Sequence, residues 1–401
     1  MLTLGRFHRE RCTSKSVLHS LGMVEARYNF SLDEARKRTG VKWTRYPKDV
    51  IPLWVADMDF PVAEPILETL QQFLDVGDLG YTHLREGATA IEAAARWFAD
   101  QHGYTPDPSH AAITSDVMQA VAAAISAFTE PGDGIIVLTP IYPPFPLAVK
   151  SAGRRFLASP LTGEWAVDLE HVATIAKDAR VILLSSPHNP SGRAFTSVEL
   201  EGIAAIAARH DLIIISDEIH ADLVYDGFAH LPTAVFPEAQ ARTLTIMAAS
   251  KSFNIAGIGC GVVFFGSAEL AKRFAALPSS LVGHPRAVNV RSSAVAWQSG
   301  MPWLHETKEV LASNRAAVDG WARRNGIGHA VPEATYLAWL DFRDLGWEEE
   351  PYDLLLRDAR VALSPGLDFG PDRGFARLNF ATSPEILRQA FERMDEVVGG
   401  S

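Results

Sequence analysis

Two polar residues that follow short apolar runs have the chemistry of a catalytic pair. Asp217 follows the run Leu212–Ser216, and Lys251 follows Leu244–Met247 after three small residues. A lysine amine made neutral can attack a carbonyl carbon and form a Schiff base, whereas a buried acid is costly unless it is paired. The alternative is a structural ion pair between Asp217 and Lys251, and on either motif alone that alternative is slightly favoured.

A third feature could bind phosphate. A strand-like run meets the helix-like stretch Val117–Phe128 at Ser115 and Asp116. The N–H groups of Val117 and Met118 would be free at this helix N-terminus, where anions bind readily. An ordinary cap by Ser115 or Asp116 fits the same residues.

Two residues that precede prolines could contact a flat ligand. Pro190 biases Asn189 away from the helical region, which fixes the direction of its amide, and Pro143 likewise holds Tyr142 extended. The ring of Tyr142 could then stack on the ligand. A plain turn at Asn189 and a core tyrosine at 142 are the alternatives.

Together these residues supply a lysine nucleophile, an acid, an amide, an aromatic face and a phosphate cradle. Pyridoxal 5'-phosphate (PLP) requires this set. Lysine binds its aldehyde carbon, and an acid keeps the pyridine nitrogen protonated, so that the ring accepts electrons from a carbanion. We therefore expect PLP as the cofactor.

The elements that must position these residues alternate between short apolar runs and helix-like stretches. Continuous apolar runs indicate strands buried on both faces, and helices between them indicate a parallel, doubly wound α/β sheet whose strand ends gather ligands. The expected strands are Ala111–Thr114, Gly134–Leu138, Val181–Ser185, Leu212–Ser216, Leu244–Met247 and Gly261–Phe265, and the expected helices are Val117–Phe128, Leu169–Lys177 and Val198–Arg209. Thr196 and Glu199 have capping-box spacing at the start of the last helix.

The C-terminal part of the chain has a different pattern. A helical stretch near Glu306–Arg323 precedes the strand-like Tyr336–Phe342 and Phe375–Phe380, and a closing helix starts at Pro384. We expect a small α+β domain from residues 28–70 and 305–401, and a large PLP-binding α/β domain from residues 71–304.

The N-terminal segment indicates a leader rather than part of a domain. Residues 1–27 are basic and lack an apolar core segment, so we expect a disordered extension rather than a secretory signal. Beyond it, Ser31 and Glu34 have capping-box spacing before a helical stretch that Gly40 can close.

Composition excludes several classes of protein. The 401 residues are 47% hydrophobic and 21% charged, as in ordinary globular proteins, and the net charge of −11 disfavours general binding to nucleic acid or anionic membrane. No apolar run is long enough to cross a bilayer. Two cysteines, Cys12 and Cys260, exclude a disulfide framework and a cysteine-based zinc ribbon. We expect a reducing, cytoplasmic setting and no catalytic metal.

The order of the motifs resembles a known family. Tyr142, Asn189-Pro190, Asp217 and Ser250-Lys251 together resemble the fold-type I PLP enzymes of the class I/II aminotransferase superfamily. Finer matches, from about residue 28 to the C-terminus, resemble its cystathionine β-lyase (C–S β-lyase) proteins of the MalY/PatB type. These matches are Trp54–Phe60, Gly80–Thr82, Pro187–Pro190, Ser216–His220, Ser250–Asn254, Thr335–Leu340 and Arg377–Ala381.

The resemblance implies a role for each cofactor-binding residue. Lys251 would form the Schiff base and move the α-proton of the substrate. Asp217 would pair with the pyridine nitrogen, Asn189 would hydrogen-bond the ring hydroxyl oxygen, and Tyr142 would stack on the ring. The N–H groups of Val117 and Met118, with Ser250, would hold the phosphate.

The resemblance also implies contacts with the substrate and with a second subunit. Arg377 would clamp the substrate α-carboxylate through a bidentate pair, and Ala56 would lie against the substrate. Strand alternation places Arg377 and Asn379 on one face, although an edge-strand surface arginine is the alternative. Tyr81 would reach the phosphate of the neighbouring subunit, which implies a homodimer with shared active sites.

Two positions depart from the usual aminotransferase pattern. His220 stands where a tyrosine is usual, and Gly259 stands where an arginine usually neutralises the phosphate. Both departures resemble the C–S lyase subgroup. The phosphate then depends more on helix N–H groups, and His220 either donates to the cofactor ring or caps its loop. Arg286 and Arg291 line the site or a dimer interface, or they are exposed.

These observations favour a PLP-dependent C–S β-lyase. The resemblance implies that an amino acid such as L-cystathionine loses its α-proton to Lys251 and releases a thiol, and that water hydrolyses the remainder to pyruvate and ammonia. An aminotransferase uses the same residues but passes the amino group to an oxo acid; His220 and Gly259 favour the lyase. A regulatory or partner-binding protein on this fold is a third hypothesis, and it predicts a damaged site.

Overall fold

A seven-stranded sheet is the largest layer of the computed structural model, which describes residues 27–77, 79–80 and 84–399. Its strand order is β2-β8-β7-β6-β5-β3-β4. The strands are β2 (Ala111–Thr114), β3 (Gly134–Thr139), β4 (Arg155–Pro160), β5 (Ala179–Ser185), β6 (Ile213–Asp217), β7 (Thr243–Met247) and β8 (Gly261–Phe265). Strands β3 to β7 are parallel, whereas β8 is antiparallel to both neighbours. The expected mostly parallel α/β sheet is confirmed.

Both faces of this sheet are buried, which explains its continuous apolar strands. In β3, Ile135 and Val137 pack on the face covered by α6 (Val117–Phe128) and α7 (Pro144–Ser151). Ile136 and Leu138 pack on the other face, covered by α8 (Leu169–Ile175) and α9 (Ser197–Arg209). Helices α6, α8 and α9 lie where the sequence predicts them.

One strand of the seven-stranded sheet, β4, was not predicted from the sequence. Strand β4 is the edge of the sheet, and most of its residues are exposed or half-buried. An edge strand needs no long apolar run, and the apolar run in Arg155–Pro160 is only the three residues Phe156 to Ala158.

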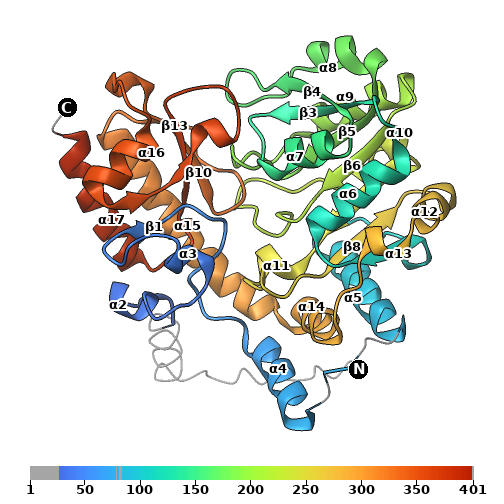
Figure 1. Cartoon of the computed structure of the whole chain (residues 1–401), viewed down its shortest axis with the longest axis horizontal. Coiled ribbons are helices and arrows are strands. Elements are labelled where there is room, and N and C mark those ends of the chain that lie inside the picture. Colours follow the sequence, from blue (N-terminus) through green and yellow to red (C-terminus); the bar gives the residue numbers. More distant parts are fainter. Residues whose placement is uncertain (1–26, 78, 81–83, 400–401) are drawn as a thin grey trace, which may run out of the picture.

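The C-terminal residues form a second, antiparallel sheet. Its order is β12-β13-β10-β9, with β9 (Gly328–His329), β10 (Leu337–Asp341), β12 (Ser364–Pro365) and β13 (Phe375–Asn379). Helices α15 (Met301–Arg324) and α17 (Pro384–Val398) belong to the same part of the chain. Strand β1 (Ile51–Pro52) pairs with β11 (Val361–Ala362), so the N-terminal segment joins this lobe. Figure 1 shows the two lobes, with α11 (Ala249–Ser252) between them. The proposed domain boundaries stay a prediction.

The remaining elements are mostly short. The other helices are α2 (Leu32–Ala35), α3 (Val41–Thr44), α4 (Glu64–Val76), α5 (Leu84–His102), α10 (Pro237–Gln240), α12 (Ala268–Ala275), α13 (Ser279–Val282), α14 (Ala287–Ser299) and α16 (Pro351–Leu354). Turns of 3₁₀ helix span Pro108–His110, Ala176–Asp178, Thr233–Val235, Arg343–Leu345 and Gly366–Asp368, and a π-helical turn spans Leu355–Ala359. None of the helices in the described ranges is long and apolar enough to cross a bilayer.

The capping boxes are confirmed, but the first helix is shorter than expected. Ser31 and Glu34 cap each other's backbone at the start of α2, and Thr196 and Glu199 do the same for α9. Helix α2 ends after one turn, at Ala35, and Gly40 caps the start of α3 instead of closing α2. Three residues beyond this end, the Arg38 side chain donates to the backbone oxygen of Asp59.

Candidate active site

A cavity of about 250 Å³ lies at the carboxyl ends of the parallel strands, beside α11. The predicted site residues line it, with the exception of Tyr81, which lies outside the described residues. They are Ala56, Val117, Met118, Tyr142, Asn189, Asp217, His220, Ser250, Lys251 and Arg377, and the other lining residues include Val55, Asp116, Ser185, Ile219, Ala248, Ala256, Gly259 and Cys260. Residues far apart in the sequence therefore share one cavity.

Burial changes the protonation of the predicted catalytic pair. It lowers the pKa of Lys251 to about 8, partly opposed by the carboxylate of Asp57. It also raises the pKa of Asp217 to about 7, although Asp217 accepts a hydrogen bond from the Ile219 N–H at 3.1 Å. Lys251 Nζ donates to the backbone oxygen of Ala56 at 2.6 Å. In the described structure the two residues form no direct ion pair, so that simple alternative is wrong.

The start of α6 offers two free N–H groups. The Asp116 carboxylate caps the helix by accepting from the Gln119 N–H at 2.8 Å. The N–H groups of Val117 and Met118 precede the first intrahelical bond and have no acceptor among the described residues. The cap and the proposed phosphate cradle therefore coexist, since Asp116 uses neither N–H.

Gly259 is required by a close approach of two backbones. A Cβ at this position would lie 2.6 Å from the backbone oxygen of Ser115, in the loop that starts α6. No side chain fits there without moving that loop. This contact gives a steric reason for glycine at the position where an arginine is usual.

Arg377 is a buried cation without a carboxylate partner in the described structure. Its Nη1 donates to Asn189 Oδ1 at 3.0 Å, and its Nη2 donates to the Trp54 backbone oxygen at 2.9 Å and to Ser364 Oγ at 3.1 Å. Its Nε has no hydrogen-bond partner, and its guanidinium lies 4.7 Å from the centre of the Phe369 ring. Only 4% of the residue is exposed, so the surface alternative is wrong.

The segment Trp54–Phe60 forms one wall and is held from both lobes. Asn379 on β13 donates to the backbone oxygens of Val55 at 2.6 Å and Asp57 at 2.7 Å. Asn254 accepts from the Met58 N–H and donates to the Phe60 oxygen. Arg377 and Asn379 thus face the same segment, as strand alternation predicts.

Tyr336 lies in the motif Thr335–Leu340, but the sequence alone predicted no role for it. Its hydroxyl donates to the Ala56 backbone oxygen at 3.1 Å, the same oxygen that accepts from Lys251. The His220 ring lies 6.1 Å from the Tyr336 ring. Burial lowers the pKa of His220 to about 3, so its imidazole is neutral, and its Nδ1 has no partner.

Arg286 and Arg291 do not line the cavity. Both are exposed, Arg286 lies at the N-terminus of α14, and the Arg291 guanidinium lies 4.9 Å from the Phe73 ring centre. In the described ranges, no group of three or more His, Cys, Asp or Glu residues could hold a metal ion.

The residues present fit PLP. The cavity offers two unbonded N–H groups to a phosphate, an acid to a pyridine nitrogen, a tyrosine ring to a flat face and a lysine to an aldehyde. The orphaned Nε of Arg377 adds a donor for a carboxylate. The residues that carry the donors, the acid and the nucleophile all line one cavity.

Comparison with known proteins decides the family. Residues 48–394 match the aminotransferase class I and II family. The chain belongs to this family. It is 34% identical to cystathionine β-lyase PatB of Bacillus subtilis, over 91% of this chain and 98% of that protein, and 34% identical to cystathionine β-lyase of Corynebacterium glutamicum, over 92% and 99%.

A solved structure supports the same family. Cystalysin of Treponema denticola, whose structure contains pyridoxal 5'-phosphate, superposes with a TM-score of 0.87 at 29% identity, over 93% of this chain and 99% of that one. The expected fold-type I architecture and the expected family are therefore confirmed.

Proposed function

We propose that this chain is a PLP-dependent C–S β-lyase that cleaves L-cystathionine or a related cysteine thioether to a thiol, pyruvate and ammonia. The observation that carries the proposal is the buried, carboxylate-free guanidinium of Arg377 in the same cavity as Lys251. This pair of residues suits an α-amino acid, whose carboxylate would bind Arg377 while its α-carbon lies beside Lys251. Two relatives named cystathionine β-lyase support the choice of reaction.

The proposed cofactor contacts follow from the lining of the cavity. The N–H groups of Val117 and Met118, with Ser250, hold the phosphate at the positive end of α6. Asp217 pairs with the pyridine nitrogen, Asn189 with the ring hydroxyl, and Tyr142 stacks on the ring. When bound, PLP supplies an electron sink that stabilises negative charge at the substrate α-carbon.

The side chains of this protein bind the substrate and move its proton. Arg377 holds the α-carboxylate through a bidentate pair and so fixes the direction of the α-carbon–hydrogen bond. Lys251 takes the α-proton at Nζ, and its pKa of about 8 suits a base near neutral pH. The Ala56 backbone oxygen, which also accepts from Tyr336, orients that amine.

An aminotransferase remains the alternative, because the family includes that activity and the same groups serve it. The regulatory hypothesis predicts a damaged site, whereas Lys251, Asp217, Asn189 and Arg377 line one cavity. A regulatory role in addition to catalysis is compatible with this arrangement.

Product stoichiometry tests the proposed reaction. Purified enzyme loaded with PLP is given L-cystathionine without an oxo acid, and thiol, ammonia and pyruvate are measured together. We expect equal amounts of all three. Release that depends on an added oxo acid would establish transamination and overturn the proposal, and silence under both conditions would reject cystathionine as a substrate.

We also propose a homodimer with shared active sites in the cytoplasm. Helix α4 and the residues after it expose apolar side chains, namely Leu67, Leu74, Val76 and Leu79. An exposed apolar group of this kind is typical of an interface. Tyr81 follows two residues later and is the residue proposed to reach the phosphate of the other subunit. Cys260, a buried free thiol, suits the proposed reducing compartment.

A further inference from the structure

Behind the turn that carries Lys251, Asp222 joins three parts of the chain. It lies in the loop after β6, and its Oδ2 accepts a hydrogen bond from Ser252 Oγ at 2.6 Å. Its Oδ1 accepts from Trp97 Nε1 at 2.8 Å and lies 2.9 Å from His102 Nε2. Trp97 and His102 belong to α5, and Ser252 directly follows Lys251 in α11.

The carboxylate of Asp222 is buried and ionised. Its side chain is 8% exposed, and burial acts to raise its pKa. The hydrogen bond and charge of His102, with the hydrogen bonds from Ser252 and Trp97, outweigh burial and hold the pKa below its ordinary value. Hydrogen bonds to an ionised acceptor are stronger than neutral ones, so the link to Ser252 is a firm anchor.

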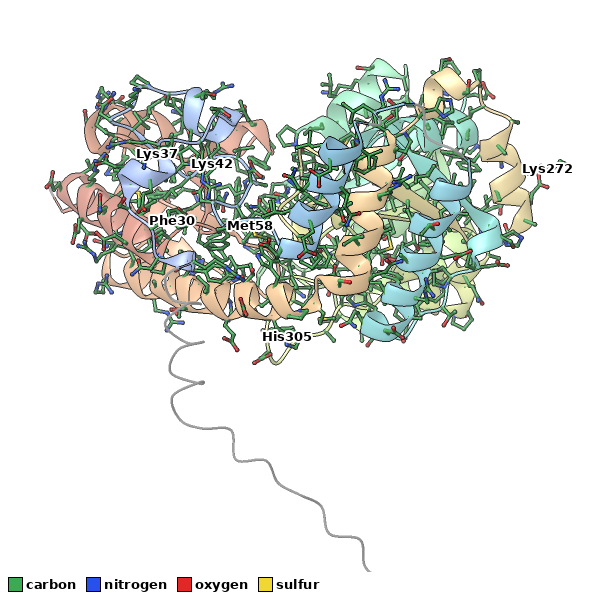
Figure 2. The ribbon with its side chains drawn as sticks, turned by 90° about the horizontal axis from the view of Figure 1, so that it is seen from below. Phe30, Lys37, Lys42, Met58, Lys272 and His305 are labelled. Atoms are coloured by element: carbon green, nitrogen blue, oxygen red, sulfur yellow. The ribbon has the colours of Figure 1, made fainter. Side chains whose placement is uncertain are left out.

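The turn that Asp222 anchors has little stability of its own. Helix α11 has only four residues, and a single turn is not stable in isolation. Lys251 lines the active-site cavity, whereas Asp222 lines a second cavity of about 330 Å³ that extends to Lys308 and His305. Figure 2 shows His305 at the outer edge of the molecule. The Ser252–Asp222 bond therefore links α11, whose Lys251 lines the first cavity, to a residue that lines the second.

We propose that Asp222 is a positioning residue, which fixes Lys251 relative to the Asp217–His220 loop through its hydrogen bond to Ser252. The proposal rests on the role of Lys251 proposed above. The charges that act on Lys251 come from Asp57, Arg377 and Asp217. Asp222 acts through the position of α11 rather than through its own charge.

The test compares two variants that each remove one hydrogen bond to Asp222. S252A breaks the link to α11, whereas W97F breaks a link to α5, keeps the Ser252 hydroxyl and keeps an aromatic ring against Phe253. The readouts are the pH midpoint of the absorbance of the cofactor bound to Lys251, kcat and KM with L-cystathionine, and thermal stability. Small displacements of catalytic groups lower the rate of the chemical step. We therefore expect kcat of S252A to fall about tenfold with KM nearly unchanged.

The pH midpoint distinguishes a positioning role of Asp222 from a role in protein stability alone. We expect it to move by about half a unit in S252A and in D222N, and to return toward wild type in S252T, which keeps the hydroxyl. W97F should lose more thermal stability, because it leaves a space in the core, yet keep the wild-type midpoint.

The positioning role of Asp222 would be overturned if S252A kept the wild-type pH midpoint and kcat. It would also be overturned if W97F shifted the pH midpoint as much as S252A does. The absorbance readout does not depend on lyase activity. If the wild type binds PLP but releases no thiol or pyruvate, the proposed function fails, and the midpoints of S252A and W97F still decide the role of Asp222.

Discussion

The surroundings of Arg377 indicate that the ligand carries a carboxylate. A buried guanidinium without a carboxylate is costly, and its neighbours supply only neutral oxygens. We expect R377A to raise KM for L-cystathionine about 100-fold, since two charge-assisted hydrogen bonds are lost. Steady-state kinetics measure this effect.

Arg343 provides the matched control. It also lies over an aromatic ring, at 4.6 Å from the Phe375 centre, but it is exposed and pairs with Asp341. R343A should leave KM unchanged. Equal KM values for R377A and wild type would remove Arg377 from the substrate site.

Asp217 makes the stability of the cofactor-free protein depend on pH. Its pKa in the folded chain is about 7, against an ordinary 3.8, so the folded state holds the proton more tightly than the unfolded state. Ionising Asp217 therefore lowers stability as the pH rises through this interval. D217N removes this penalty and should make the cofactor-free protein more stable than wild type at about pH 8, with the advantage vanishing near pH 4.

Urea midpoints at the two pH values measure this difference. The same difference in urea midpoint between D217N and wild type at both pH values would contradict the raised pKa of Asp217. The same variant should lose most activity when loaded with PLP, because a neutral amide does not hold the pyridine nitrogen protonated.

At the scale of residues, the sequence predicted which side chains meet in the cavity where a residue follows a strand, and the proposed roles of these side chains stay predictions. Lys251 and Asp217 were found because a parallel sheet gathers its strand ends. Tyr336 and Asp222 received no role, because the partners of Asp222 lie at least 30 residues away along the chain and Ala56 lies 280 residues from Tyr336. Spacing along a sequence carries no signal for such contacts.

At the scale of elements, the backbone before β8 lies close to the loop that starts α6, at the proposed phosphate site. G259A would bring a Cβ to 2.6 Å from the Ser115 backbone oxygen and push the loop that presents Val117 and Met118. Overpacking of this kind costs about 1–3 kcal/mol, so we expect the Kd for PLP to rise about tenfold.

Gly257 is the control for this prediction, because a Cβ there meets no atom within 4 Å. G257A should bind PLP like wild type in an absorbance titration. Equal affinities for G259A and wild type would show that the α6 N-terminus does not hold the phosphate.

The sequence predicted elements well where their surroundings are uniform. Helix α6 and strand β8 have the expected bounds, because both are buried along their length. Strand β4 was missed at an exposed edge, and α2 ends at Ala35, earlier than predicted. Local patterns fail where tertiary contacts end an element or where one face meets water.

At the scale of the whole molecule, the site depends on two lobes that meet at the Trp54–Phe60 segment. Figure 2 shows Met58 near the boundary between the lobes and Lys42 on the lobe that β1 joins. A buried ion pair between Lys42 and Asp59, at 2.8 Å, fixes the end of the segment. The sequence showed the motif but not which strands hold it, because pairing between distant segments leaves no local signature.

The proposed homodimer is also a property of the whole molecule. Leu74 on α4 is 67% exposed, and Leu147 on α7 is 65% exposed. L74K should weaken the dimer and reduce activity, since it places a charge in the proposed apolar interface, whereas L147K should change neither. Sedimentation velocity measures the assembly, and a fully active wild-type monomer would contradict shared sites.

The most direct test asks where the cofactor is attached. The purified protein is incubated with PLP, borohydride makes the lysine–cofactor link permanent, and mass spectrometry maps the modified peptide. We expect one modification, on Lys251, and no modification of the corresponding peptide in K251A. A modification on another lysine, or none in the wild type, would contradict the assignment of the cavity as the PLP site.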